Sequence, residues 1–193
     1  MKEDNINRIL DLGIEIMNRK GYHHLGLKEL LDEAGIPKGS FYYYFKSKED
    51  FGEKVIAHYA NNILKYMSSV LSDKSKGPGE RLISMFQNNE KVYESSGFKE
   101  GCLMGKCSNE LAGQYDSMQL LMDQKFSSWK GVISQCIKEG QEMGEFRSDL
   151  SADDLADFIL NNWEGALIRM KATRSVKPYT LFVDYTMNVI LKA

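Results

Sequence analysis

Two features that secreted and membrane proteins need are missing from this sequence. No apolar run approaches the roughly 20 residues of a membrane-spanning helix, and the N-terminal segment MKEDNINRIL is charged where a signal peptide has an apolar core. The three cysteines are an odd number and lack the spacing of metal ligands, a pattern that fits a reducing compartment better than a disulfide framework. We therefore expect a cytoplasmic protein with no membrane partner.

Catalytic motifs are missing as well. His23 and His24 are not accompanied by a carboxylate or cysteine constellation, and His58 stands alone on an expected long helix. No phosphate-binding loop, nucleophile elbow or metal-binding motif is present. We therefore expect neither an enzyme nor a cofactor or metal, and we interpret His58 as a core or cavity histidine.

The composition is that of a globular chain. With 193 residues, 42% hydrophobic and 27% charged, the sequence is long enough for one sizeable core or for a small domain joined to a larger one. The net charge of −2 looks unfavourable for a nucleic-acid-binding protein. Such binding depends on a local basic patch, however, and an acidic remainder can limit non-specific binding, so this class is not excluded.

Helical periodicity runs through almost the whole chain. The main interruption is SDKSKGPGE, residues 72–80, which is rich in Ser, Lys, Gly and Pro and is expected to be a loop. The expected fold class is all-α with about nine helices. These helices are expected near residues 6–20, 27–34, 38–45, 48–71, 82–93, 102–113, 118–140, 152–170 and 178–190.

Residues 21–51 contain the most specific local pattern. Apolar residues between Leu27 and Ala34 have the i, i+3, i+4, i+7 spacing of a helix with one buried face. Gly35 is suited to end this helix in a left-handed conformation, and Pro37 prevents its continuation. A second short helix is expected over Lys38–Phe45. The segment therefore predicts two short helices joined by a tight turn.

The second short helix is expected to expose polar groups on one side and to bury two aromatic residues on the other. Phe41 and Phe45 lie one turn apart and are expected in the core, while residues 36–48 contain three lysines and no acid. A helix–turn–helix of this kind places side chains in the major groove of DNA, and flanking lysines can meet phosphates. The alternative is an ordinary helical hairpin, but three consecutive tyrosines cannot all be buried on one short helix. The expected outer face consists of Ser40, Tyr42, Tyr43 and part of Tyr44.

The run AGIPKGSFYYYFKSKEDF resembles the helix-turn-helix signature of the TetR family of transcriptional regulators. The match covers about thirty residues, and one departure is Gly26, where many relatives carry a Ser or Thr helix cap. The resemblance implies that the protein binds a double-stranded DNA operator. The residues expected to bind DNA are Lys28, Lys38, Gly39, Ser40, Tyr42, Tyr43, Tyr44 and Lys48.

We expect a helix-turn-helix DNA-binding domain of three helices at residues 1–50 and a larger ligand-binding and dimerisation domain at residues 51–193. The helix expected at 48–71 begins in the first domain and continues into the second, so it is the expected mechanical link between them. Residues 151–192 are too apolar on more than one face for a monomer surface. We expect them to form a homodimer interface as a four-helix bundle, which the resemblance also implies, although a monomeric bundle could bury the same residues internally.

The larger domain is rich in methionine and aromatic residues. Most of these are interpreted as core, and a subset is expected to wall a cavity for a small apolar ligand. The candidates for effector binding are Phe86, Phe126, Trp129 and Trp163.

The segment GCLMGKCSNELA, residues 101–112, resembles the Gly-Cys-Leu segment of a TetR subgroup that includes the N-ethylmaleimide-responsive, electrophile-sensing repressor. Cys102 lies near an expected helix start with Lys106 one turn later, and Lys171 matches a lysine of the same subgroup. A helix dipole and a cation would favour the thiolate, which attacks electrophiles. The alternative is that Cys102 is a small buried hydrophobe, which is the commoner fate of a free cysteine. Cys107 is unusual at its position and is either a resolving thiol or a packing residue.

The sequence therefore favours a homodimeric repressor that a small molecule or reactive electrophile releases from a palindromic operator. In a second effector mode an apolar ligand binds without cysteine chemistry. The alternative from another class is a helical protein-interaction module that does not bind DNA.

Overall fold

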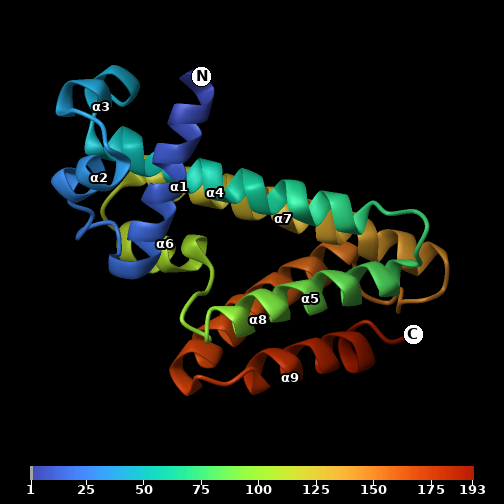
Figure 1. Cartoon of the computed structure of the whole chain (residues 1–193). Coiled ribbons are helices and arrows are strands. Elements are labelled where there is room, and N and C mark those ends of the chain that lie inside the picture. Colours follow the sequence, from blue (N-terminus) through green and yellow to red (C-terminus); the bar gives the residue numbers. More distant parts are fainter. Residues whose placement is uncertain (1) are drawn as a thin grey trace. The chain divides into compact units, whose positions relative to one another are not determined.

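The computed structural model describes residues 2–193, with side chains from residue 5 onwards, and this range is almost entirely helical (Figure 1). It contains nine α-helices, which confirms the expected all-α fold class. Their bounds are α1 Lys2–Lys20, α2 Leu27–Ala34, α3 Lys38–Tyr44, α4 Lys48–Leu71, α5 Pro78–Ser95, α6 Leu103–Leu111, α7 Asp116–Glu142, α8 Ala152–Thr173 and α9 Lys177–Tyr185.

Several helix bounds differ by a few residues from the expected ranges, and the start of α5 and the end of α9 are two of them. The break after α4 is shorter than residues 72–80, because Pro78 and Gly79 already belong to α5 and proline is well accommodated in a first helical turn. The last helix does not continue regularly to residue 190. It ends at Tyr185 and gives way to a π-helical turn, η1, over Thr186–Ile190, where the Leu191 amide donates to the Thr186 carbonyl at 2.9 Å.

The chain packs as two compact units, which are described separately. Unit 1 comprises residues 1–63 with Leu103–Lys125, and unit 2 comprises Leu64–Cys102 with Phe126–Ala193. Helices α4 and α7 each supply residues to both units. The expected functional division at residue 50 stays a prediction.

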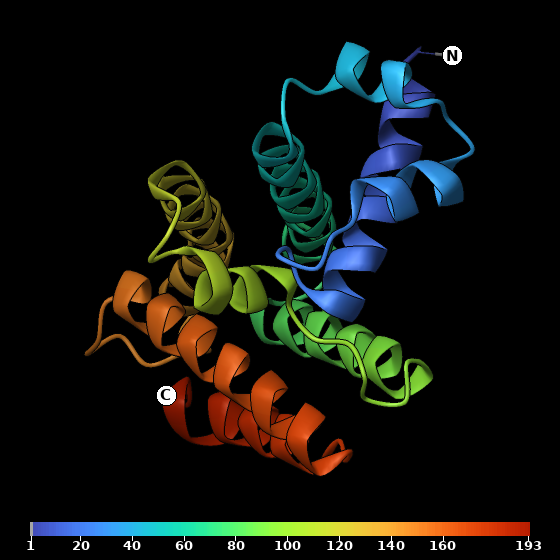
Figure 2. The same ribbon diagram turned by 90° about the vertical axis from the view of Figure 1, so that its left-hand side faces the viewer.

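In unit 1, α1 packs against both α2 and α6 (Figure 2). A Cβ atom added at Gly13 of α1 would lie 2.6 Å from a Val55 methyl carbon of α4, so glycine allows these two helices to approach closely. The Glu110 carboxylate of α6 accepts hydrogen bonds from the backbone amides of Tyr22 at 3.1 Å and His23 at 2.8 Å. These contacts fix the loop that leads from α1 into α2.

In unit 2, α9 lies along α8 and also contacts α5 (Figure 1). The Phe86 and Phe182 rings meet edge to face at 5.3 Å, and the Tyr179 hydroxyl donates to the Phe86 carbonyl at 3.1 Å. Helix α8 begins at Ser151, whose side chain accepts a hydrogen bond from the Asp154 amide at 3.0 Å, as its sequence predicts.

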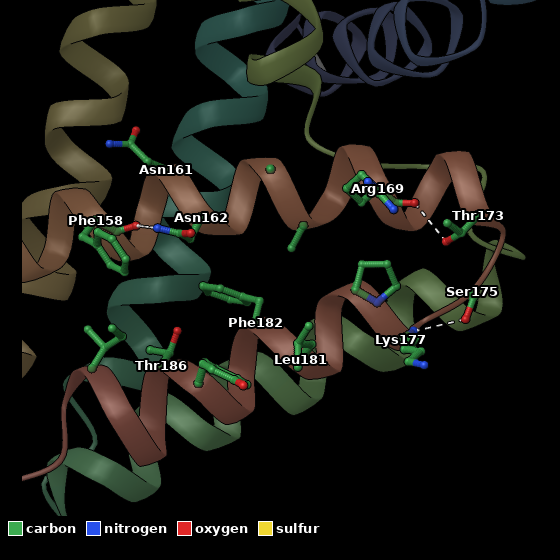
Figure 3. A pocket seen from close by; sticks show the side chains of 15 residues that line it. Phe158, Asn161, Asn162, Arg169, Thr173, Ser175, Lys177, Leu181, Phe182 and Thr186 are labelled. Atoms are coloured by element: carbon green, nitrogen blue, oxygen red, sulfur yellow. Dashed lines mark hydrogen bonds between the residues drawn. The ribbon is translucent and has the colours of Figure 1, made fainter.

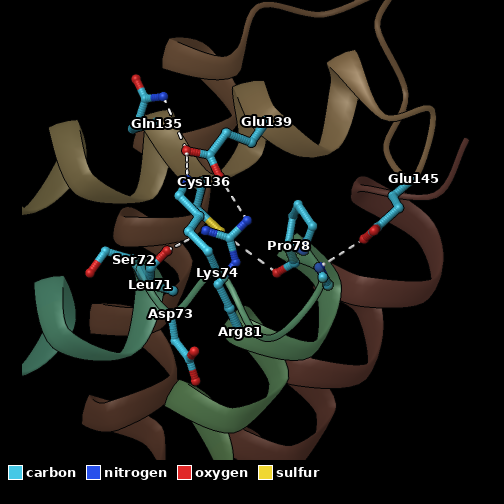
Figure 4. A network of polar contacts seen from close by, with 12 residues as sticks. Leu71, Ser72, Asp73, Lys74, Pro78, Arg81, Gln135, Cys136, Glu139 and Glu145 are labelled. Atoms are coloured by element: carbon cyan, nitrogen blue, oxygen red, sulfur yellow. Dashed lines mark hydrogen bonds and ion pairs between the residues drawn. The ribbon is translucent and has the colours of Figure 1, made fainter.

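A buried arginine holds the C-terminal end of α4 within unit 2 (Figure 4). Arg81 is 2% exposed and donates to the Leu71 carbonyl at 2.6 Å and to the Glu139 carboxylate at 2.7 Å. Lys74 reaches the same carboxylate at 2.5 Å. Hydrogen bonds from Lys74 and Arg81 lower the pKa of Glu139 to about 2. This network joins the end of α4 to the start of α5 and to α7.

Candidate DNA-binding surface and candidate effector site

The turn between α2 and α3 has the geometry that its glycine and proline predict. Gly35 is left-handed, with φ of 62°, and the Ile36 amide donates to the Leu31 carbonyl at 3.1 Å. Pro37 is extended and caps the start of α3. The two short helices are therefore joined by a tight turn of fixed conformation.

A sealed cluster of three phenylalanine rings supports α3. Phe41, Phe45 and Phe51 are each 1% exposed. Their ring centroids lie 5.1 Å apart for Phe41 and Phe45 and 4.8 Å apart for Phe45 and Phe51. This cluster fixes which side of α3 faces outward.

The outer face of α3 carries the residues that were expected there. Tyr42 is 53% exposed and Tyr43 is 69% exposed, and Lys38 is exposed at the first turn. Ser40 and Tyr44 are half-buried, with the Tyr44 ring 5.1 Å from that of Tyr43. Hydroxyl groups and a cation therefore share one solvent-facing surface.

Gly39 lies on the same surface and is open to solvent. A Cβ atom added there would meet no other residue within 4 Å, and the backbone is ordinary helix. The fold of the chain therefore does not itself require a glycine at this position. A partner that approaches the backbone closely would require a glycine there.

The remaining two expected DNA-binding lysines differ in their surroundings. Lys28 is exposed on α2. Lys48 is half-buried, because its Nζ donates to the His23 carbonyl at 3.2 Å and lies 5.0 Å from the centre of the Tyr22 ring. Lys48 therefore has a structural role in unit 1, and its role in binding DNA stays a prediction.

The four aromatic candidates for effector binding all belong to unit 2. Phe86 and Trp129 are fully enclosed, Trp163 is 5% exposed, and Phe126 is half-buried. The rings of Phe126 and Trp129 meet edge to face at 5.4 Å. Phe86 and Trp129 therefore contribute to the packed interior, whereas Trp163 is distinguished by an indole nitrogen without a hydrogen-bond partner.

The segment expected to carry reactive cysteine chemistry is divided between the units. Lys106 and Cys107 belong to unit 1, where Lys106 Nζ donates to the Asn18 carbonyl at 2.8 Å. Cys107 is 1% exposed, and burial raises the pKa of its thiol to about 12. Cys107 is thus a packed, protonated thiol in this structure.

Cys102 belongs to unit 2 and is half-exposed, directly before the first residue of α6. The side chain of Lys171 on α8 runs along the same segment, with its Cδ 3.0 Å from the place of a Cβ on Gly101. Lys171 therefore comes close to the segment that contains Cys102. The Cys102 thiol is also hydrogen-bonded to the Glu164 carboxyl group.

Glu164 and Tyr93 were missed by the sequence analysis. Burial raises the pKa of the Glu164 carboxyl group, and the hydrogen bond from Cys102 offsets part of this rise. Burial also raises the pKa of Tyr93, which lies near both Cys102 and Trp163. The pattern that could have revealed Glu164 is an acid set between two apolar residues on one helix face, Leu160 one turn before it and Leu167 one turn after it.

An open groove of about 850 Å³ runs between α8 and α9 and reaches η1 (Figure 3). Several large apolar side chains on these elements are about half exposed, including Phe158 at 48%, Leu181 at 54% and Tyr185 at 59%. A soluble monomer rarely exposes so many large apolar groups together. None of the residues Tyr93, Cys102, Trp163 and Glu164, which we call the Cys102 cluster, lines this groove.

The described residues offer no metal site and no membrane-spanning helix. No group of three or more His, Cys, Asp or Glu side chains is arranged to hold a metal ion among them. Every helix in the described part of the chain is too short or too polar to cross a bilayer. His58, expected in a core or cavity, is mostly buried and meets the Asp11 carboxylate at 2.8 Å.

Two family models match this chain. Residues 9–55 match the N-terminal domain of bacterial regulatory proteins of the tetR family, and residues 78–186 match the tetracyclin repressor-like C-terminal domain. The chain belongs to the TetR family. It is therefore a helix-turn-helix transcriptional repressor with a ligand-binding C-terminal domain, in a family of regulators rather than enzymes.

Individual TetR-family proteins are similar over nearly the whole chain. The transcriptional repressor DhaR of Mycobacterium sp. (strain GP1) is 33% identical, over 95% of this chain and 90% of DhaR. The transcriptional regulator AcuR of Cereibacter sphaeroides is 32% identical, over 84% of this chain and 74% of AcuR. The crystal structure of reduced NemR from E. coli superposes on this chain with a TM-score of 0.88, covering 97% of this chain and 98% of NemR. The two sequences are 26% identical.

These similarities establish the family without singling out its electrophile-sensing subgroup. NemR is similar to this chain, but DhaR and AcuR share more identical residues with it. The kind of effector must therefore be inferred from the residues of unit 2.

Proposed function

We propose that this protein is a homodimeric, sequence-specific repressor whose α3 helices bind a palindromic operator, and that an effector in unit 2 releases it from the DNA. The observation that carries the proposal is the outer face of α3. Tyr42 and Tyr43 are exposed next to Phe41, which is sealed in the core. A helix held so rigidly can present the same groups to each duplex it meets.

The chemistry of this face suits DNA. Lys38 supplies a cation for phosphate, and the tyrosine and Ser40 hydroxyls can donate to phosphates or base edges. Gly39 allows the backbone of α3 to approach the duplex where a side chain would stand in the way. The expected DNA-binding set remains Lys28, Lys38, Gly39, Ser40, Tyr42, Tyr43, Tyr44 and Lys48.

The apolar groove of α8 and α9 supports the homodimer. Exposed residues such as Phe158, Leu181 and Tyr185 would be buried if the same helices of a second copy completed a four-helix bundle. A two-fold dimer would also present two copies of α3 to the two halves of a palindromic operator.

The effector would act in unit 2, at Cys102 or in an apolar site beside it. Helix α4 is continuous from unit 1 into unit 2, where Arg81 holds its last carbonyl group. An effector that binds more tightly when α4 is displaced would favour the state with low DNA affinity. The effector mode is either covalent modification of Cys102 or non-covalent binding of a small apolar molecule.

An electrophoretic mobility shift with DNA from upstream of the protein's own gene tests this function. We expect a specific complex that weakens steeply between about 50 and 200 mM salt, because phosphate contacts release counterions. The mass in solution should be that of two chains. A monomer that shows no sequence-specific complex would instead support the helical protein-interaction module.

A further inference from the structure

Helix α1 ends at a glycine that turns the chain away from the helix axis. Gly21 has φ of 85°, a left-handed conformation that ends the helix. In a continued helix, the Tyr22 amide would donate a hydrogen bond to the Asn18 carbonyl. Backbone groups that are shielded from water need partners, so both of these groups must find new ones after the turn.

Helix α6, which packs against α1 within unit 1, supplies both partners (Figure 1). Lys106 Nζ donates to the Asn18 carbonyl at 2.8 Å. One turn later on α6, the Glu110 carboxylate accepts a hydrogen bond from the Tyr22 amide at 3.1 Å. The cation meets the carbonyl end of α1 and the anion meets an amide, so both charges have a favourable sign.

The Glu110 carboxylate also holds the next residue of the loop. Its Oε1 accepts a hydrogen bond from the His23 amide at 2.8 Å, so its two oxygens bind two successive amides. A Cβ atom added at Gly21 would lie 2.7 Å from Glu110 Oε2, so the glycine leaves room for the carboxylate. Hydrogen bonds to an ionised acceptor are stronger than those between neutral groups. Glu110 therefore fixes the backbone of Tyr22 and His23.

Lys48, the first residue of α4, rests on the same two residues. Its Nζ donates to the His23 carbonyl at 3.2 Å and lies 5.0 Å from the centre of the Tyr22 ring. The Tyr115 ring holds the Tyr22 ring from another side, edge to face at 5.6 Å. An ammonium group has three donors, so the contact with His23 leaves donors for a phosphate oxygen.

We propose that Glu110 is a positioning residue for operator binding, because it holds the loop on which the Lys48 ammonium group is placed to meet a DNA phosphate. This inference rests on the proposed binding of an operator. It adds a residue from α6, outside the helix-turn-helix, to those on which the DNA affinity depends.

Two other roles for Glu110 predict different results. If Glu110 acted on DNA only through its charge, its removal should strengthen binding, because DNA is a polyanion. If Glu110 only completed the end of α1, its removal should lower the thermal stability and leave the affinity of the folded protein unchanged. A positioning role predicts weaker binding, since a Lys48 side chain that is no longer held must be ordered when DNA binds.

Four variants of the full-length chain separate these roles. Glu110→Ala removes the carboxylate, whereas Glu110→Gln removes its charge and keeps one acceptor oxygen for an amide. Asp123→Asn removes the same charge from an exposed position of α7 in unit 1 and is the matched control. Lys48→Met removes the ammonium group that Glu110 is proposed to position.

The affinity for DNA from upstream of the protein's own gene is the first measurement. Glu110→Ala should weaken specific binding about tenfold, as expected for roughly one lost contact. Glu110→Gln should restore part of this loss, and Asp123→Asn should bind as tightly as the unaltered protein or slightly more tightly. The difference in sign between Glu110→Ala and Asp123→Asn separates positioning from net charge.

Salt dependence and a double variant test whether Glu110 acts through Lys48. Lys48→Met and Glu110→Ala should each lower the number of counterions released on binding by about one. Adding Glu110→Ala to Lys48→Met should change the affinity by less than about twofold, because the group to be positioned is already gone. Two independent residues would instead show losses that multiply.

Thermal unfolding of each variant provides the control for stability. Glu110→Ala should lower Tm by less than about 5 °C, so the protein remains folded at the temperature of the binding measurement. If Glu110→Ala does not fold, Glu110→Gln carries the test with the same expected signs and a smaller loss of affinity.

The outcomes distinguish this inference from the function on which it rests. If the unaltered protein binds the operator and the Glu110 variants bind equally well or more tightly, the positioning role is wrong and operator binding stands. The same holds if Lys48→Met has no effect, or if the losses from Glu110→Ala and Lys48→Met multiply. If the unaltered protein forms no specific complex, the proposed function and this inference both fail.

Discussion

The outer face of α3 and the Cys102 cluster beside α8 both hold polar groups on helices whose other residues form a core. On α3 these groups are in solvent, since Tyr42 is 53% exposed and Tyr43 69%. On α8 they are inside, since Trp163 is 5% exposed and two polar atoms are buried without partners. The first arrangement suits a large polyanion that must be met at a surface. The second keeps its polar groups away from solvent.

The largest effect should come from the core beneath the DNA-binding face. Phe41→Ala removes a ring that packs against Phe45 and Phe51, and it should lower the free energy of unfolding by about 3–5 kcal/mol. Denaturant unfolding measures this loss in the free energy of unfolding. Tyr42→Ala, one residue away, should change the same quantity by less than about 0.5 kcal/mol. Equal losses in the two variants would place Tyr42 in the core and remove the contrast between the two faces.

The network at the end of α4 should have the next largest effect on stability. Arg81→Met leaves the Leu71 carbonyl without its donor and should cost about 2 kcal/mol at pH 7. Lys74→Met removes an exposed partner of the same carboxylate and should cost less than about 1 kcal/mol. Thermal or denaturant unfolding compares the two variants.

The pH dependence of this network follows from Glu139. Its folded-state pKa is lowered from 4.5 to about 2, so the stabilisation is present above the unfolded value and is lost as pH falls through the folded one. The difference between the unaltered protein and Arg81→Met should therefore shrink between about pH 5 and pH 2. A difference that stays constant over this range would mean that Arg81 acts through Leu71 alone.

On the outer face of α3 the expected changes are in DNA affinity. Tyr42→Ala should weaken operator binding about tenfold, the equivalent of roughly 1.4 kcal/mol for one lost contact. Lys38→Ala should lower the number of counterions released on binding, which the slope of log affinity against log salt concentration measures, by about one. Lys65→Ala removes the same charge from an exposed position in unit 2 and is the control. A loss of affinity as large for Lys65→Ala would mean that net charge, and not the α3 face, governs binding.

The same contrast explains how much could be predicted from the sequence. The bounds of α2, Leu27–Ala34, were predicted because apolar spacing, a left-handed glycine and a proline all act within a few residues. The burial of Phe41 and the exposure of Tyr42 follow from the same local geometry. A surface built from neighbouring residues can thus be inferred without tertiary information.

The Cys102 cluster could not be found in this way. Tyr93, Cys102 and Glu164 lie on three different parts of the chain, and no local spacing indicates that a thiol meets a buried carboxyl group. Lys48 is another case, because only the fold brings its ammonium group to the His23 carbonyl. The change from α9 to the π-helical η1 was also not predicted, because the apolar periodicity of the sequence continues through it.

The smallest effect concerns the start of α2, where Gly26 departs from the capping residue common in relatives. Gly26 has φ of −82°, and a Cβ there would come no closer than 3.9 Å to another side chain, so Gly26→Ser fits without strain. It should stabilise the protein by a few tenths of a kcal/mol, because serine can accept a hydrogen bond from a backbone amide of the first turn. The converse change, Ser151→Ala at the start of α8, should cost about 1 kcal/mol. Denaturant unfolding measures both, and Gly26→Ser should leave operator affinity unchanged. A loss of affinity without a loss of stability would mean that DNA approaches the start of α2 as closely as it approaches Gly39, and the DNA-binding surface would then have to be extended beyond α3.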